Sequence, residues 1–146
     1  KLMRDQGATA RVVFAEVAAT ARALAESDRA DLQAIGRRLD AGLRAWSEAT
    51  DWLLANAKIG VSGVLTAAVP YLDLAVIVTG GWLMGKAALA AASYLDRGEG
   101  DLPFYRAKLA SAAFYADQML PQAAAKAATV IAGDAALAGM GDELFQ

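Results

Sequence analysis

Three acidic side chains stand where a carboxylate could take part in chemistry. Glu48 and Asp51 are close enough in sequence for paired acid–base work, but they lie beside Arg44 on a polar stretch and no partner motif accompanies them. Asp73 is a lone carboxylate in an apolar stretch, where a raised pKa or a bound ligand would be sought. If Pro70 occupies the first turn of a helix, Asp73 lies about one turn further on, where free N–H groups favour its charge. We therefore predict a helix-capping role for Asp73 rather than a catalytic one.

Other chemistry is limited by the residues that the chain lacks. It contains no histidine and no cysteine, which excludes disulfides, thiolate chemistry and the Glu-x-x-His pairs of di-iron and di-manganese bundles. Gly80, Gly81 and Gly85 match neither of the glycine-rich phosphate-binding fingerprints, so we expect them to admit a neighbouring helix or an aromatic ring. We assign no catalytic, cofactor-binding or metal-ligating residue to this chain.

The composition indicates one all-α domain. The chain has 146 residues, 13 glycines, only 3 prolines and abundant alanine, a balance that favours helix. Its formal charge of −2 gives no strong field for nucleic acid or anionic lipid. The segment Lys1–Gln6 holds neither an apolar signal segment nor an initiator methionine. We therefore expect a cytoplasmic protein, and a chain that is a piece of a longer one.

Apolar side chains recur every three or four residues in four segments, the period of amphipathic helices. The first segment runs from Gly7 to about Glu26, and the second follows a polar break in which Ser27 or Asp28 can cap the next helix. The second segment has the clearest stripe, made of Leu32, Ile35, Leu39, Leu43, Trp46, Thr50 and Leu53.

The third segment is apolar nearly all round and ends at about Arg97. It begins either at Ser62, with a kink, or near Pro70. One stripe comprises Leu72, Val76, Thr79, Leu83, Ala87 and Ala90, and the other comprises Leu74, Ile77, Gly81, Met84 and Ala88. Such a helix must be contacted on more than one side. We do not expect it to span a membrane, because Asp73 and Lys86 interrupt the run of about 20 apolar residues that a span needs.

The fourth segment follows a break at residues 97–103 and ends at Gly133, a natural C-cap. Its stripe comprises Leu109, Ala113, Ala116, Leu120, Ala124, Ala127 and Ile131. Residues 136–146 are expected to add at most one turn of helix. Four long segments with short breaks predict an antiparallel four-helix bundle with a short C-terminal tail. We expect its core to include Leu39, Leu43, Trp46, Leu83, Leu109 and Leu120.

Several short motifs are shared with a known family. They are Pro70-Tyr71-Leu72, Gly80-Gly81-Trp82-Leu83-Met84, Phe104-Tyr105-Arg106-Ala107-Lys108-Leu109-Ala110, Phe114-Tyr115 and Leu120-Pro121. Together they resemble the C-terminal helical domain of long bacterial acyl-CoA dehydrogenases, in the subgroup that includes the 3-methylmercaptopropionyl-CoA dehydrogenases. Residues 1–7 are similar to the segment that closes the family's dehydrogenase core, although Gln6 stands where a glycine is expected.

The resemblance implies a parent flavoenzyme that oxidises an acyl-CoA to the 2-enoyl-CoA. In the family a glutamate base takes the α proton, FAD takes the β hydride, and an electron-transfer flavoprotein reoxidises the flavin. That glutamate lies in a Tyr-Glu-Gly-Thr stretch, which this chain lacks. We therefore expect the base and most FAD contacts upstream of Lys1, and we expect residues 1–146 to form a single non-catalytic domain.

The expected role of this domain is docking onto its own dehydrogenase core or onto a second subunit. The aromatic residues Trp52, Trp82, Phe104 and Tyr115 belong either to the docking surface or to the internal core. Two other functions remain open. One is a lipid- or membrane-interface module, suggested by the small excess of basic residues on the fourth segment. The other is a stand-alone helical scaffold.

Overall fold

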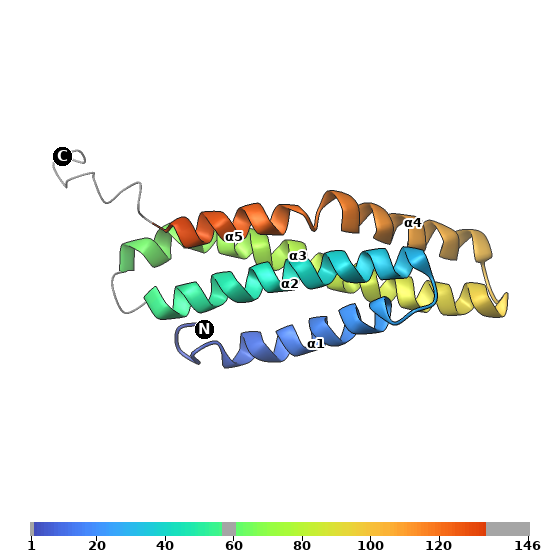
Figure 1. Ribbon diagram of the computed structural model, residues 1–146, viewed down its shortest axis with the longest axis horizontal. Coiled ribbons are helices and arrows are strands. Elements are labelled where there is room, and N and C mark those ends of the chain that lie inside the picture. The colour runs from blue at the N-terminus through green and yellow to red at the C-terminus, as the bar shows by residue number, and fades with distance from the viewer. Residues whose placement is uncertain (1, 57–60, 134–146) are drawn as a thin grey trace.

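The periodic segments fold as helices that lie side by side in an elongated bundle (Figure 1). The computed structural model describes residues 2–56 and 61–133, and describes side chains for 2–56 and 66–133. Within these residues the chain is all-α, without strands. The helices are α1 (Ala8–Ala25), α2 (Ala30–Asn56), α3 (Val61–Arg97), α4 (Leu102–Gln118) and α5 (Gln122–Ala132). Because α4 and α5 follow one another along the same side, they share the fourth position of the predicted four-helix bundle.

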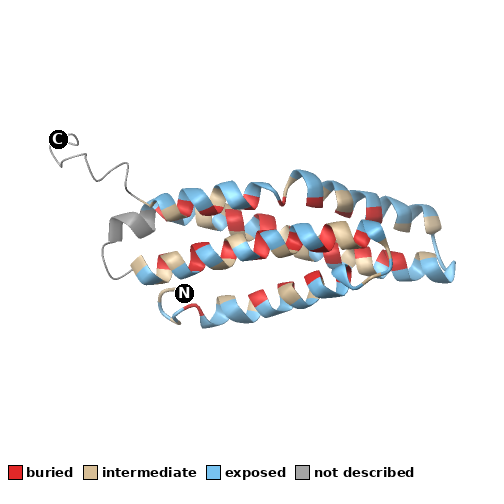
Figure 2. Ribbon diagram, viewed as in Figure 1, coloured by how far each residue is buried: buried red, intermediate tan, exposed pale blue. Residues whose placement is uncertain are grey.

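The helices α2 and α3 form the centre of the bundle. They contact each other, α1 packs on both of them, and α4 and α5 also pack on both of them. The residues that face these contacts are buried, while most outward residues are exposed (Figure 2). The core therefore runs along α2 and along the part of α3 whose side chains are described.

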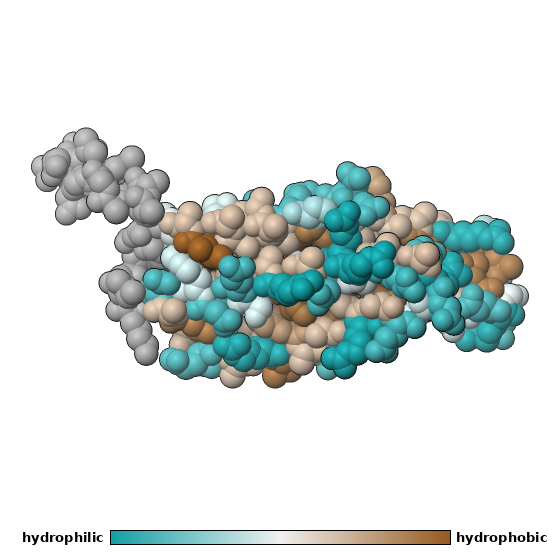
Figure 3. Space-filling view, in the orientation of Figure 1, coloured by the Kyte–Doolittle hydropathy of each residue, from teal (hydrophilic) through white to brown (hydrophobic). Residues whose placement is uncertain are grey.

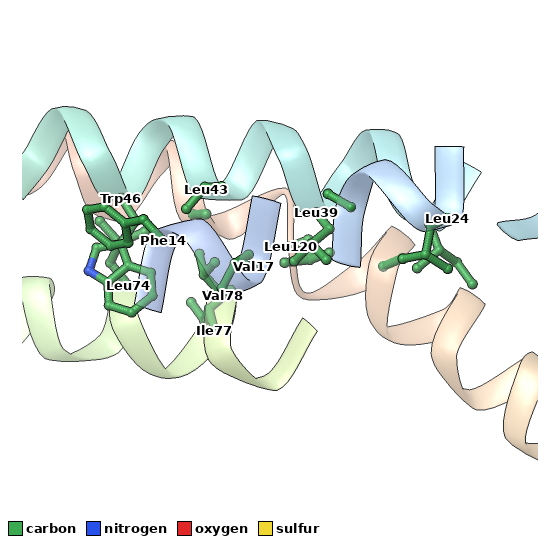
Figure 4. Close-up of a cluster of buried hydrophobic side chains, with 14 of the residues drawn as sticks. Phe14, Val17, Leu24, Leu39, Leu43, Trp46, Leu74, Ile77, Val78 and Leu120 are labelled. Carbon is green, nitrogen blue, oxygen red and sulfur yellow. The ribbon is translucent and has the colours of Figure 1, made fainter. Parts of the chain in front are cut away.

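The predicted stripe of α2 is buried along its full length, from Leu32 to Leu53. Figure 4 shows residues of this stripe meeting side chains from α1 and α3. Phe14 of α1 meets Trp46 edge to face, with 4.9 Å between the ring centres. Thr50 is buried and its hydroxyl lies 2.8 Å from both the Trp46 carbonyl and the Tyr71 hydroxyl of α3. The prediction for this helix is confirmed.

The helix α3 starts earlier than one of the two predicted alternatives. It begins at Val61, so Pro70 lies inside the helix. Asp73 is then well removed from the helix start and from its free N–H groups, and the predicted capping role is wrong. The Asp73 carboxylate instead accepts a hydrogen bond from Lys126 of α5, with Nζ and Oδ2 2.7 Å apart.

The two apolar stripes of α3 have different surroundings. Leu74, Ile77, Gly81 and Ala88 are buried against the bundle. Leu83, from the other stripe, is 57% exposed, so the prediction that it belongs to the core is wrong. Leu39, Leu43, Trp46, Leu109 and Leu120 are buried as predicted. Both stripes have the period of a buried face, and only the positions of the neighbouring helices decide between them.

The predicted fourth helix is interrupted at residues 119–121. Pro121 has no N–H to continue the hydrogen-bond ladder, and the chain restarts as α5 one residue later. The interruption shifts the buried register, because Ala123 and Val130 are buried while the predicted Ala124 is exposed. Gly133 caps α5 with a positive φ of 59°, as predicted. The predicted C-terminal tail at residues 136–146 lies outside the described residues.

Candidate functional site

An exposed apolar stripe runs along the side of α3 that faces away from the bundle. Four large side chains on it are exposed by more than half of their area. They are Val69 (69%), Leu72 (63%), Val76 (61%) and Leu83 (57%). Soluble monomers rarely expose large contiguous apolar patches, and those that do so generally use them for binding.

The stripe extends beyond these four residues. Thr79, Ala87, Ala90 and Tyr94 follow at helical spacing on the same side, and none of them is charged. We call this set, from Val69 to Tyr94, the outward face of α3. The opposite face of the molecule, over α2, differs in character, because hydrophilic side chains alternate there with apolar ones (Figure 3).

The helix α3 is long and hydrophobic enough to cross a membrane. Among the described residues, Thr66–Arg97 is the one segment with this length and composition, and 39% of its most apolar stretch is buried inside the protein. A core helix of a soluble protein can have the same length and composition. Length and composition therefore leave the prediction about the membrane untested.

Three glycines hold α3 close to its neighbours on the inward side. A Cβ at Gly80 would overlap the Tyr115 phenol of α4, and one at Gly81 would lie 2.6 Å from a methyl carbon of Leu120. A Cβ at Gly85 would lie 2.9 Å from a methyl carbon of Leu24 in α1. The prediction that these glycines admit a helix or an aromatic ring is confirmed. The inward side of α3, opposite the outward face, is therefore tightly packed against α1 and α4.

Side-chain hydrogen bonds also join α3 to its neighbours. The Tyr115 hydroxyl donates to the Ile77 carbonyl at 3.1 Å, and the Trp82 indole N–H donates to the Thr20 hydroxyl of α1 at 2.9 Å. Burial raises the pKa of Tyr115, so the phenol remains a protonated donor at neutral pH. These contacts fix α3 against α1 on one side and against α4 on the other.

The charged groups that flank the outward face are engaged within the chain. Asp73 pairs with Lys126 of α5, and the Lys86 ammonium lies 4.9 Å from the centre of the Trp82 ring. The predicted docking surface thus has an uncharged centre with charges only at its edges. This pattern is typical of protein interfaces, which lack charged residues at the core of the patch.

The aromatic residues whose role was open divide between the core and the surface. Trp52, Trp82 and Tyr115 are partly buried and pack against the core. Phe104 is half exposed near the start of α4, where its ring lies 5.1 Å from the Lys108 ammonium. Three of these four residues are therefore internal, and the exposed apolar surface consists mainly of aliphatic side chains.

The carboxylates considered for acid–base chemistry do not form a site. The Asp51 carboxylate accepts a hydrogen bond from Arg11 of α1 at 3.0 Å, with both side chains more than half exposed. Arg44, which lies between Asp40 and Glu48 along the helix, pairs with Asp40 at 2.7 Å. Exposed ion pairs of this kind are common on protein surfaces and contribute little to stability.

The sequence analysis missed an ion-pair cluster that joins the start of α2 to the end of α3. Arg29 contacts Asp31 at 2.9 Å and Asp96 at 3.4 Å. The hydrogen bond from Arg29 holds the pKa of Asp31 below its usual range, and the same bond raises the pKa of Arg29. The cluster borders an open groove of about 460 Å³ that Arg106 also lines. Only the charge-rich spacing of residues 28–31 hinted at it, and Asp96 is too distant in sequence to be found that way.

We assign no flavin or metal site to the described residues. In the groove beside Arg29 that guanidinium is engaged by two carboxylates, and Arg106 is the other cation of the lining. Among the described residues no group of acidic side chains is arranged to hold a metal ion. We derive no catalytic step from this part of the chain.

The described residues thus form a helical bundle with an apolar outer face along α3. The sequence profile of the family described as "Acetyl-CoA dehydrogenase C-terminal like" matches residues 13–141. The chain belongs to this family of acyl-CoA dehydrogenase C-terminal domains. It is also 36% identical over 126 residues to a 3-methylmercaptopropionyl-CoA dehydrogenase of Ruegeria pomeroyi. That alignment covers 86% of this chain and 21% of the relative, so the chain spans about a fifth of the relative's length.

Proposed function

We propose that this chain is the non-catalytic docking domain of an FAD-dependent acyl-CoA dehydrogenase. The parent enzyme oxidises an acyl-CoA to the 2-enoyl-CoA and passes its electrons to an electron-transfer flavoprotein. Residues 1–146 form one domain in the cytoplasmic parent protein, and residues 1–7 close the dehydrogenase core that precedes them. Family membership supports this reading, since the match extends over nearly the whole chain.

The main observation in favour of docking is the outward face of α3. It exposes large aliphatic side chains along one helix, while the glycine contacts of Gly80, Gly81 and Gly85 keep that helix fixed. A preformed apolar surface of this kind loses little conformational entropy when a partner covers it. Its partner is the dehydrogenase core or a second subunit.

Sedimentation velocity tests the docking role. The chain is studied alone and mixed with the parent dehydrogenase truncated before Lys1. We expect association at tens of micromolar, either with itself or with the truncated enzyme. Leu83→Glu should abolish it, whereas Phe114→Glu, which alters an exposed residue of α4, should not. A chain that stays monomeric and does not bind the truncated enzyme would overturn the docking role.

A separate measurement tests the non-catalytic part of the proposal. The chain alone should neither bind FAD in a calorimeter nor reduce a dye in the presence of acyl-CoA, because its sequence holds neither a phosphate-binding glycine loop nor the family's glutamate stretch. Stoichiometric FAD binding or dye reduction by the chain alone would contradict it. This outcome is independent of whether the chain associates.

A membrane-interface role is the second candidate, and the length and hydropathy of α3 favour it. An interfacial helix carries lysine and arginine along the rim of its apolar face. The rim of α3 instead carries Asp73 as well as Lys86, and Lys126 is already paired. Flotation with vesicles of anionic phospholipid decides between the two roles, since only the membrane role predicts that the chain rises with the lipid.

A further inference from the structure

The chain enters the bundle at a fixed place, between the start of α1 and the end of α2 (Figure 1). Leu2 and Met3 pack against the core, and the Leu2 carbonyl accepts the Gly7 N–H at 3.0 Å. The Asp5 carboxylate accepts that same N–H at 3.1 Å, and it also accepts the N–H and the hydroxyl of Thr9 in the first turn of α1. Backbone and side-chain contacts thus hold the entering segment in one path.

The turn before α1 ties this segment to α2 as well. Gln6 and Gly7 both have positive φ, at 54° and 78°. This left-handed conformation is unfavourable for a residue with a side chain, and it persists where the surrounding contacts require it. At Gly7 a side chain is also excluded by space, because a Cβ would lie 2.8 Å from a methyl carbon of Leu54 in α2. The entering chain therefore lies directly against α2.

A small notch opens beside the entering segment. Its volume is about 190 Å³, and it is lined by Leu2, Asp5, Thr9, Ala10, Val13 and Trp46. The two polar side chains of short reach in this lining bind each other, since the Asp5 carboxylate accepts the Thr9 hydroxyl. The surface that remains for a partner is mainly apolar. We call this set of six residues the entry notch.

The size of the entry notch limits which occupant it suits. Pockets for small molecules and cofactors measure about 300–1,000 Å³, so the notch is better matched to a single side chain. A contact of that size is too small for a separate partner, because specific interfaces between independent proteins bury about 1,200–2,000 Å². A covalently attached partner needs much less area, since a short connection gives an effective concentration on the order of millimolar. An attached partner is therefore the occupant that the notch can retain.

The chain that precedes Leu2 is such an attached partner. The matched family consists of C-terminal domains, and the matched region covers 21% of the Ruegeria pomeroyi relative. In the proposed function the dehydrogenase core therefore comes before Lys1. Because Leu2 itself lines the entry notch, that core begins beside it. Neither a second copy of the chain nor a membrane is attached at this place.

We propose that the entry notch receives an apolar side chain of the preceding dehydrogenase core, so that the core packs on the end of the bundle where the chain enters. This inference rests on the proposed docking function and locates one contact with the parent's own core. The fixed entering segment sets the direction from which the core approaches, and the notch holds the core there.

Thiol labelling tests whether the notch is covered in the parent enzyme. The chain has no cysteine, so a thiol introduced into residues 1–146 is the only one there. Ala10→Cys places a thiol in the notch, and the matched control Ala15→Cys places one at an exposed position of the same helix outside the notch. Each variant is treated with a maleimide in the isolated chain and in the full parent enzyme. Mass spectrometry of the labelled peptides then gives the two rates.

We expect Ala10→Cys to react at least about tenfold more slowly in the parent enzyme than in the isolated chain, as for a site that is open less than about a tenth of the time. Ala15→Cys should react equally fast in both proteins. Equal rates for Ala10→Cys in the two proteins would overturn the inference. Equal slowing of both variants would overturn it as well, because the cover would then not be specific to the notch.

A third variant separates failure of this inference from failure of the proposed function. Leu83→Cys places a thiol on the outward face of α3, where 57% of the natural side chain is exposed. If Leu83→Cys is slowed in the parent enzyme while Ala10→Cys is not, docking stands and the notch is not its site. If both react in the parent enzyme as fast as Ala15→Cys, the inference and the docking role are overturned together.

Discussion

The two central helices, α2 and α3, are both buried on one side, but their exposed sides differ in composition. The buried stripe of α2 is matched by charged residues on its exposed side, such as Asp40 and Arg44. The helix α3 is apolar on its exposed side as well, where Leu72 and Val76 meet solvent. Burial in the bundle accounts for one apolar face of a helix. The proposed docking role would account for the second apolar face of α3.

The largest expected effect contrasts the two faces of α3 with one residue type. Leu74→Ala empties a fully buried site and should lower the free energy of unfolding by about 2–5 kcal/mol. Leu72→Ala, two residues away but exposed, should change it by less than about 0.5 kcal/mol when the chain is monomeric. Urea denaturation at low protein concentration measures both. Equal losses would mean that the faces are assigned wrongly.

A smaller effect is expected where α3 approaches α4. Gly80→Ala forces a methyl group into the Tyr115 ring, whose Cζ would lie 2.8 Å away, and overpacking of this kind costs about 1–3 kcal/mol. The gain in helix propensity offsets about 1 kcal/mol of that cost. A double-mutant cycle with Tyr115→Ala isolates the clash, because the combined loss should be less than the sum of the single losses. Additive losses would show that the ring does not limit the approach.

A hydrogen bond between Thr50 and Tyr71 joins α2 to α3. Thr50→Val keeps the shape of the side chain but leaves the Tyr71 hydroxyl without its partner on α2. We expect a loss of about 0.5–1.5 kcal/mol in thermal or urea denaturation. Tyr71→Phe should cost a similar amount, and the double variant little more than either one. A neutral Thr50→Val would mean that water replaces this contact at no cost.

The smallest effect concerns the ion pairs that join the start of α2 to the end of α3. The pKa of Asp31 is lower in the folded chain than in the unfolded chain, because Arg29 donates a hydrogen bond to it. The unfolded chain therefore binds more protons between the two values, and this stabilisation is present above the unfolded pKa of about 3.9 and lost as the pH falls through the folded one. Asp31→Asn should flatten the acid side of a stability–pH curve. An unchanged acid side would show that the pair contributes nothing.

The sequence predicted most of the fold because periodicity alone locates an amphipathic helix. For α2 the stripe from Leu32 to Leu53 left one choice of inward face, and that choice is correct. For α3 both stripes satisfied the same rule, so Leu83 was assigned to the core although it is exposed. Pro121 was included in a continuous pattern because alanines fit either register across it.

The candidate site was predictable only in outline. A helix that is apolar on two sides indicates an outside contact, and this much is evident from residues 71–97. The face that makes the contact depends on where Tyr115, Leu120 and Leu24 pack, and these lie on other helices. The partnership of Asp73 with Lys126 is equally invisible in the sequence, because it joins residues 53 positions apart.

The interruption between α4 and α5 also affects the local stability of α5. The Tyr115 carbonyl accepts the N–H groups of both Met119 and Leu120, and Pro121 has none to donate. The α-helical ladder is therefore broken, and turn-type bonds from Gln122 to Met119 and from Ala123 to Leu120 span the interruption. With 11 residues, α5 is shorter than the roughly 12–15 at which isolated helices persist in water. It stays helical only while Ala127 and Val130 remain docked. We therefore expect α5 to open locally before the longer helices do, which amide hydrogen exchange would detect.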